Sequence, residues 1–258
     1  MNKLGIFVNF WEKKWAVDHR YYIDKVKSLG YDILEFQAQP LLEMSDGECR
    51  KIRKYAEERG IELSYSLGLN KKYDVASGDE EVRKGGVEYL KRIVEKIAVM
   101  EGELFSGVTF AGWGLPDHFV GEAEKRALFE RSAESMREVM KTAEKEGVTV
   151  CVEAVNRFES PLINTAEEAL RYADMVDSPN IGIHLDTYHM NIEENSIGEA
   201  IRKAGKRLRH FHTGENNRNI PGRGHIDWDE VFGALKEIGY ERNIVSEPFL
   251  MMGALSCY

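Results

Sequence analysis

Short apolar runs alternate with longer amphipathic segments along the whole chain. The runs predict eight strands, at residues 4–10, 32–37, 61–67, 103–110, 148–153, 181–186, 207–212 and 243–247. Helical periodicity between them predicts helices at 18–29, 46–59, 79–100, 122–146, 165–176, 196–204 and 227–238. Strands that alternate regularly with helices indicate a parallel α/β fold. Eight such strands in 258 residues favour a single (β/α)₈ TIM-barrel domain spanning residues 1–258.

The two ends of the predicted barrel refine this interpretation. An open, doubly wound sheet would need a glycine-rich phosphate turn after the first strand, whereas FVNFWEKKW follows it here. After the last predicted strand only residues 248–258 remain, too few for a full covering helix. We therefore expect a barrel that lacks the full C-terminal eighth helix, with its seam either left open or covered by another chain.

Composition narrows the classes of function. The formal net charge is −9, which argues against a nucleic-acid partner. No segment reaches the roughly 20 apolar residues of a bilayer span, and the N-terminal segment does not resemble a signal peptide. Three scattered cysteines do not form a disulfide or zinc pattern. We expect a cytoplasmic protein that does not bind membranes.

Four of the predicted strands end in a residue that can bind a metal ion. These residues are Glu153, Asp186, His212 and Glu247, spaced 33, 26 and 35 residues apart. A barrel of about 250 residues gives roughly 31 residues to each strand–helix unit. The spacing therefore predicts one ligand at the carboxyl end of each successive strand, and all such ends share one rim. Three carboxylates and one imidazole suit a hard or borderline divalent ion.

Two further histidines share strand faces with these ligands. His184 lies two residues before Asp186, and His210 two residues before His212. Since side chains alternate along a strand, both are expected one layer deeper in the barrel. They would then either donate hydrogen bonds to the ligating carboxylates or be hydrogen-bonded core residues without a catalytic part. The sequence favours neither.

The loops beyond the strands carry more polar candidates. Glu159 lies six residues past Glu153, His189 three past Asp186, and Arg218 six past His212, in a glycine-rich loop. Loops on this rim usually carry function in barrels. For His189 and Arg218 we therefore favour a functional role.

The segments CVEAVNRFE, LDTYHMNIEE, HFHTGENNRNIPGRG and SEPF, together with the opening GIFVNFWEKKW, resemble the ketose 3-epimerases. This is the D-tagatose and D-allulose (psicose) 3-epimerase group of the xylose-isomerase-like TIM barrels. The resemblance covers nearly the whole chain. It implies that the four ligands bind Mn²⁺ or Co²⁺, with Mg²⁺ as an alternative, and that the enzyme is a homodimer or homotetramer.

The resemblance also implies the substrate and the site residues. The substrate would be a free ketose such as D-fructose, D-allulose, D-tagatose or D-sorbose, inverted at C3 through a metal-stabilised cis-enediolate. The expected acid and base are Glu153 and Glu247, which come from non-adjacent strands. Further residues are implied to bind the sugar: Glu159, His189 and Arg218 at its C1–C2 end, Phe7, Trp113 and Phe249 as walls, and Trp15 and Ser66 near the more variable part.

Three other functions remain open at the level of sequence. An aldose–ketose isomerase could use the same site for proton transfer between C1 and C2. A metal-dependent phosphodiesterase such as an apurinic endonuclease would need more metal ligands and a basic surface, which seven histidines and a charge of −9 disfavour. An inactive, truncated remnant is the third alternative.

Overall fold

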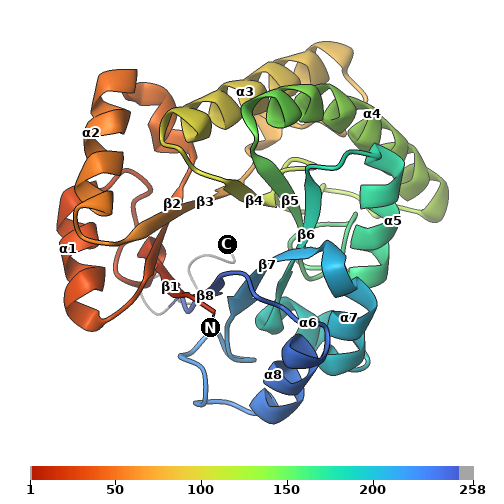
Figure 1. The fold of residues 1–258 in the computed structure, drawn as a ribbon. Helices are drawn as coiled ribbons and strands as arrows, with labels where there is room; N and C mark the ends of the chain where they lie inside the picture. The colour runs from red at the N-terminus through yellow and green to blue at the C-terminus, as the bar shows by residue number, and fades with distance from the viewer. Residues whose placement is uncertain (1, 250–258) are drawn as a thin grey trace.

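The strands close into one parallel barrel in chain order (Figure 1). The computed structural model describes residues 2–249. Strand β1 pairs with both β2 and β8, where Gly5 lies opposite Ile33 and Val245. The strands are β1 (Leu4–Phe7), β2 (Ile33–Gln37), β3 (Glu62–Gly68), β4 (Leu104–Val108), β5 (Thr149–Ala154), β6 (Ile181–Asp186), β7 (Leu208–Thr213) and β8 (Ile244–Ser246). The predicted TIM-barrel class is confirmed.

The helices surround the barrel as an outer layer (Figure 1). Their bounds are α1 (His19–Leu29), α2 (Asp46–Glu57), α3 (Glu80–Val99), α4 (Glu122–Glu146), α5 (Ala166–Val176), α6 (Thr187–Glu193), α7 (Ile197–Ala204) and α8 (Trp228–Glu237), with 3₁₀ turns η1 (Val8–Phe10), η2 (Gln39–Glu43), η3 (Lys71–Tyr73) and η4 (Gly205–Arg207). The apolar faces of these helices pack on the strands, which joins barrel and helices into one large core. All seven predicted helices are present.

Two local predictions differ from the structure. The predicted first strand runs to residue 10, but the chain turns into η1 after Phe7, and Val8 and Asn9 stay buried there. The sequence pattern cannot separate a strand from a buried turn that continues the same apolar run. The other difference is α6, which was not predicted. It is seven residues long and follows β6 without a loop, because Asp186 both ends the strand and caps the helix by accepting from the Tyr188 amide at 2.9 Å.

The end of the chain bears on two predictions. The predicted absence of a full eighth helix concerns residues 250–258, which lie outside the described residues. The assignment of residues 1–258 to a single domain also stays a prediction.

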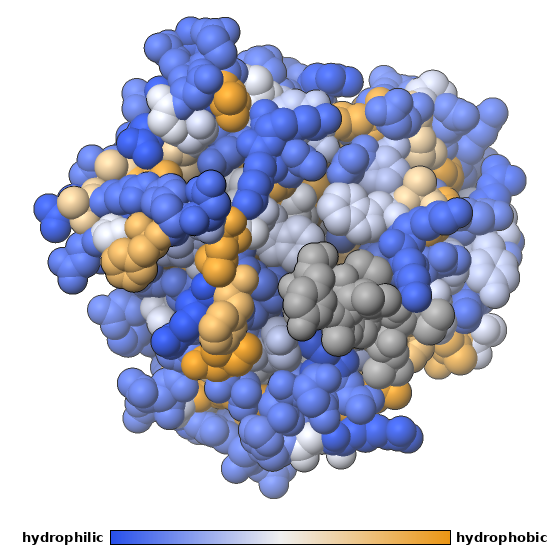
Figure 2. Space-filling view, turned by 180° about the vertical axis from the view of Figure 1, so that it is seen from behind, coloured by the Kyte–Doolittle hydropathy of each residue, from blue (hydrophilic) through white to orange (hydrophobic). Residues whose placement is uncertain are grey.

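Charged side chains occupy the outer surface of the helices. Pairs such as Lys84–Glu80 and Lys203–Glu167 are exposed, so each contributes little to stability. On the face shown in Figure 2, hydrophilic side chains predominate and apolar ones occur in small separate groups. Among residues 2–249, no helix combines the length and apolar character that a bilayer span needs.

Gly107 has a specific role in β4. It pairs with Leu67 of β3 and has a φ of +108°, a backbone conformation that residues other than glycine rarely adopt. A Cβ atom at this position would lie 2.3 Å from the Leu67 carbonyl oxygen, which is backbone and cannot rotate away. The sequence indicated only that this glycine interrupts a strand, whereas the structure requires it there.

Replacing Gly107 with Ala should lower the free energy of unfolding by about 2 kcal/mol or more, because strain and a backbone clash combine. Gly85→Ala is the matched control, because Gly85 is exposed in α3 and a Cβ there would meet nothing. That change should stabilise the helix by up to about 1 kcal/mol. Urea denaturation of both variants measures the difference, and equal stability of the two would contradict this account of β4.

Candidate metal centre and active site

The four candidate ligands meet at the carboxyl end of the barrel. Glu153 lies on β5, Asp186 ends β6, His212 lies on β7, and Glu247 directly follows β8. Each offers one ligand atom, and the four atoms lie within 4.8 Å of one another. All four residues are at most 7% exposed. The fold therefore brings together residues that are 94 positions apart between the first and the last (247 − 153).

Three buried carboxylates this close repel one another. Burial raises the pKa of Glu153, and the neighbouring Glu247 raises it further. Burial likewise raises the pKa of Asp186 to about 6, although Arg218 opposes the shift. At Glu247 the effect of burial is outweighed by His212 and Arg218, which lower its pKa to about 2. The site thus holds an excess of negative charge that a cation would relieve.

Arg218 supplies part of that positive charge. Its Nη1 donates to Asp186 Oδ2 at 2.5 Å and to Glu247 Oε2 at 3.0 Å. Its guanidinium carbon lies 4.1 Å from the centre of the Tyr188 ring and 4.9 Å from that of Phe249. One guanidinium does not neutralise three carboxylates, so negative charge remains for a metal ion to neutralise.

His212 presents a free nitrogen to the same point. Its Nδ1 is buried without a hydrogen-bond partner, although it lies 3.3 Å from Glu247 Oε2. An imidazole lone pair facing a carboxylate is unfavourable unless a proton or a metal ion lies between them. Three carboxylate oxygens and this nitrogen form a donor set that suits Mn²⁺, Co²⁺ or a similar ion.

The three polar residues expected to hold the sugar lie against this centre. Asn156 donates to His189 Nδ1 through its backbone amide at 3.1 Å and to Glu159 Oε1 through its side chain at 2.9 Å. Both ring nitrogens of His189 face donors, because its Nε2 lies 3.1 Å from Arg218 Nη2 and neither the amide nor the guanidinium can accept. Nε2 also lies 3.6 Å from Glu153 Oε1. His189 is thereby held beside the ligands.

A tight loop fixes the position of Arg218. Its φ is +58°, a backbone conformation that is uncommon for arginine. The loop closes on the buried carboxylate of Glu215, which accepts from the Gly222 amide and from Trp228 Nε1, each at 2.7 Å. The Arg218 amide in turn donates to the Glu215 carbonyl at 2.9 Å. The buried Glu215 carboxylate thus holds the loop in place.

Aromatic residues flank the polar groups. Phe7 is buried, and its ring meets that of Phe249 edge-on with centroids 6.0 Å apart. Trp113 packs on Gly68, where a Cβ would lie 2.7 Å from the indole, and donates to Glu159 Oε2 at 3.1 Å. Trp113 therefore contacts Glu159, and Phe7 packs on Phe249, which lies beside Arg218.

The remaining two candidates are less closely connected. Ser66 is buried on β3, opposite Gln37 and Ser106 on the neighbouring strands. Trp15 lies half-buried in the loop between η1 and α1. That these two residues line the sugar pocket stays a prediction.

Known proteins are similar to this chain over nearly its whole length. Residues 23–251 match the model of the xylose isomerase-like TIM barrel family. The D-psicose 3-epimerase of Ruminiclostridium cellulolyticum is 43% identical over 251 residues, which are 97% of this chain and 85% of that protein. The L-ribulose 3-epimerase of Mesorhizobium japonicum is 35% identical, over 96% of this chain and 82% of that protein. The chain belongs to the ketose 3-epimerases.

A solved structure agrees with this assignment. The crystal structure of D-psicose 3-epimerase with D-tagatose from Clostridium cellulolyticum H10 has a TM-score of 0.93 at 43% identity, covering 97% of this chain and 86% of that one. The chain is therefore an isomerase-class enzyme, as the sequence resemblance implied.

Within this ketose 3-epimerase, the two deeper histidines do not act as one of the sequence interpretations suggested. His184 Nδ1 bonds Ser106 Oγ at 2.7 Å and is 3.7 Å from Glu153 Oε2, beyond hydrogen-bond distance. His210 Nε2 lies 2.8 Å from Glu35 Oε2. Neither makes a hydrogen bond to one of the four ligand candidates' carboxylates, and the second ring nitrogen of each, His184 Nε2 and His210 Nδ1, is buried without a partner.

Sequence reasoning missed two residues of the epimerase site. Glu35 lies in the middle of β2, completely buried, and a carboxylate within an apolar run was the available signal. Asn156 follows β5 in the VNRFE segment and bonds both His189 and Glu159. Its role depends on loop geometry that no sequence pattern encodes.

Metal binding should stabilise the fold by mass action. Manganese at 100 times its dissociation constant is expected to raise the free energy of unfolding by about 2.7 kcal/mol. Asp186→Asn should remove most of this gain because a ligand oxygen and its charge are lost. The matched control is Asp174→Asn, an exposed carboxylate on α5, which should keep the gain. Thermal unfolding with and without Mn²⁺ measures both, and an unchanged gain in Asp186→Asn would contradict the proposed ligand set.

Proposed function

We propose that this enzyme inverts C3 of a free ketose, using Glu153 and Glu247 as the two groups that exchange the C3 proton. The observation that carries the proposal is that Glu153 on β5 and Glu247 just after β8 come from non-neighbouring strands, yet one ligand atom of each lies within 4.8 Å of the other. With one oxygen of each glutamate on the metal, the other two oxygens would flank opposite faces of a flat sugar intermediate. The names of the relatives, D-psicose and L-ribulose 3-epimerases, support a ketose as substrate.

The two glutamates differ in their environment, which suits opposite roles. Burial and Glu247 raise the pKa of Glu153, which favours its neutral, proton-donating form. His212 and Arg218 overcome burial at Glu247 and lower its pKa, which favours the proton-accepting form. A pair with diverging pKa values provides an acid and a base in one site. Their roles would exchange when the reaction runs in reverse.

We assign the metal ion to Glu153, Asp186, His212 and Glu247, with Mn²⁺ or Co²⁺ as the preferred ion. Once bound, such an ion polarises the C2 carbonyl and lowers the energy of the negative charge that develops when C3 loses its proton. The donor set and the unpartnered Nδ1 of His212 support this assignment.

The remaining polar residues orient the sugar. His189 would hydrogen-bond a sugar oxygen through its imidazole, and Arg218 would donate from a guanidinium already fixed by Asp186 and Glu247. Glu159 would accept from a hydroxyl group, since Asn156 and Trp113 hold its two oxygens in place. Phe7 and Phe249, whose rings contact each other, would exclude water on one side and so strengthen these interactions. We further propose that the active enzyme is a homodimer or homotetramer.

Both Glu153→Gln and Glu247→Gln should slow net inversion at C3 by at least about 100-fold, because each lacks the acid or base on one face. The glutamate that remains should still exchange the C3 proton of the one epimer that faces it. Glu159→Gln should chiefly raise KM. NMR of the sugar in D₂O follows inversion and exchange separately, in protein whose metal content has been measured. Wild-type inversion by a fully metal-loaded Glu247→Gln protein would end the two-base scheme.

Removing the metal should abolish the reaction. Manganese-loaded protein incubated with fructose is expected to yield allulose, and tagatose and ribulose should also be inverted at C3. Dialysis against a chelator should remove this activity, and Mn²⁺ or Co²⁺ should restore it better than Zn²⁺. Chromatography identifies the products. An aldohexose as the sole product would indicate an isomerase, and full activity in metal-free protein would refute the proposal.

A further inference from the structure

A polar layer lies directly beneath the proposed metal ligands, inside the barrel. Its members are completely or almost completely buried and come from β2, β3, β4, β6 and β7: Glu35, Ser64, Ser106, His184 and His210. TIM-barrel interiors are usually filled by branched apolar side chains. This layer takes no part in the proton transfer proposed above, so its composition needs another reason.

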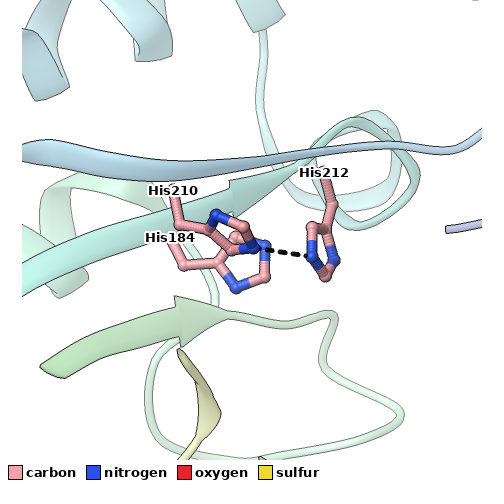
Figure 3. Close-up of side chains that lie close together, drawn as sticks. All are labelled: His184, His210 and His212. Atoms are coloured by element: carbon pink, nitrogen blue, oxygen red, sulfur yellow. Dashed lines mark hydrogen bonds between the residues drawn. The ribbon is translucent and has the colours of Figure 1, made fainter. Parts of the chain in front are cut away.

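Glu35 is the centre of this layer. Its Oε2 accepts from Ser64 Oγ at 2.7 Å and lies 2.8 Å from His210 Nε2. Its Oε1 lies 2.7 Å from His212 Nε2. Figure 3 shows the three histidine rings gathered together, and its dashed line marks the 2.9 Å contact between His210 Nε2 and His212 Nε2. Glu35 offers each of these nitrogens a closer acceptor, so its oxygens are the favoured partners of both N–H groups.

Stability alone does not account for such a residue. A carboxylate that is 0% exposed loses its hydration, and buried ionic groups can often be replaced by apolar side chains without loss of stability. Removing one partner from such a group is costly, but including the group at all is not required for folding. The contacts of Glu35 therefore point to a function in the site above it.

We propose that Glu35 is a positioning residue for the metal centre. By accepting from Nε2–H of His212, it fixes the ring and its tautomer so that the Nδ1 lone pair faces the ligand cluster. The inference rests on the proposed metal centre and adds a residue that the four-ligand set does not include.

The alternative tautomer shows why this matters. With its proton on Nδ1, His212 would donate to Glu247 Oε2, only 3.3 Å away, and would have no lone pair for a metal ion. Packing does not prevent this, because the neighbouring rings of His184 and Phe7, at centroid distances of 4.0 and 6.4 Å, constrain the plane of the imidazole but not its protons. The hydrogen bond to Glu35 selects the metal-binding tautomer. Carboxylate–histidine–metal arrangements act in this way.

A second cation in the inner cluster is the competing interpretation. His184, His210 and His212 also have ligand atoms within 4.8 Å of one another. One observation disfavours a metal there: the Nε2 atoms of His210 and His212 both face Glu35 at hydrogen-bond distance. His184 Nδ1 is bonded to Ser106, whereas its Nε2 is buried without a partner. We therefore interpret the inner cluster as a hydrogen-bonded support, and the stoichiometry of metal binding distinguishes the two interpretations.

The test compares Mn²⁺ binding to metal-free wild-type protein and variants by electron paramagnetic resonance, which counts free Mn²⁺. Glu35→Leu removes the acceptor with little change in volume and should weaken Mn²⁺ binding by about 10- to 100-fold. Glu35→Gln keeps an acceptor oxygen and should recover part of the loss. Ser64→Ala, the matched control, leaves both histidine contacts intact and should change affinity by less than about tenfold. Wild type should bind one Mn²⁺ per chain.

Either of two outcomes would overturn the inference. One is that Glu35→Leu binds Mn²⁺ as tightly as wild type, and the other is that wild type binds two Mn²⁺ ions per chain. A further measurement does not depend on any variant: NMR of ¹⁵N-histidine-labelled wild type loaded with diamagnetic Zn²⁺ should show His212 protonated on Nε2 and bound to the ion through Nδ1. A proton on Nδ1 in the loaded protein would refute the positioning role even if Glu35→Leu does not fold. His212→Ala separates the two proposals, because unchanged Mn²⁺ binding in that variant would instead refute the metal centre itself.

Discussion

Mutual repulsion among Glu153, Asp186 and Glu247 is the constraint on which the rest of the site depends. Water would screen these charges, but the barrel rim buries them. A cluster of this kind persists only where positive charge and hydrogen-bond donors are fixed around it. Arg218 provides one such charge, His212 directs a free nitrogen at the same point, and a divalent ion would supply the remainder. The cluster therefore favours a bound metal ion.

The parts of the barrel that support this cluster have different tasks. The strands fix the backbone positions of the metal ligands, and the loops position the side chains around them. Glu215 holds the loop that carries Arg218, and Asn156 holds both His189 and Glu159. Glu35 supports His212 from beneath. In each case a buried polar residue fixes one that reaches the site, so the geometry does not depend on exposed side chains.

Much of this could be predicted from sequence because the relevant signals are periodic. Strand β6 matches its predicted bounds, and the spacing of Glu153, Asp186, His212 and Glu247 follows the strand–helix repeat. Three features could not be predicted, for physical reasons. Helix α6 is too short to show a period and begins on the last strand residue. The need for glycine at position 107 arises from contact with the backbone of another strand. Glu35 pairs with His212 across 177 positions, a contact that only barrel closure creates.

We propose that one divalent ion binds at the four-residue cluster. Anomalous diffraction from crystals soaked in Mn²⁺ locates such an ion independently of activity. We expect one strong peak per chain, bonded to His212 Nδ1 and to one or more oxygens of Glu153, Asp186 and Glu247. A peak among His184, His210 and His212, or none within the barrel, would contradict it.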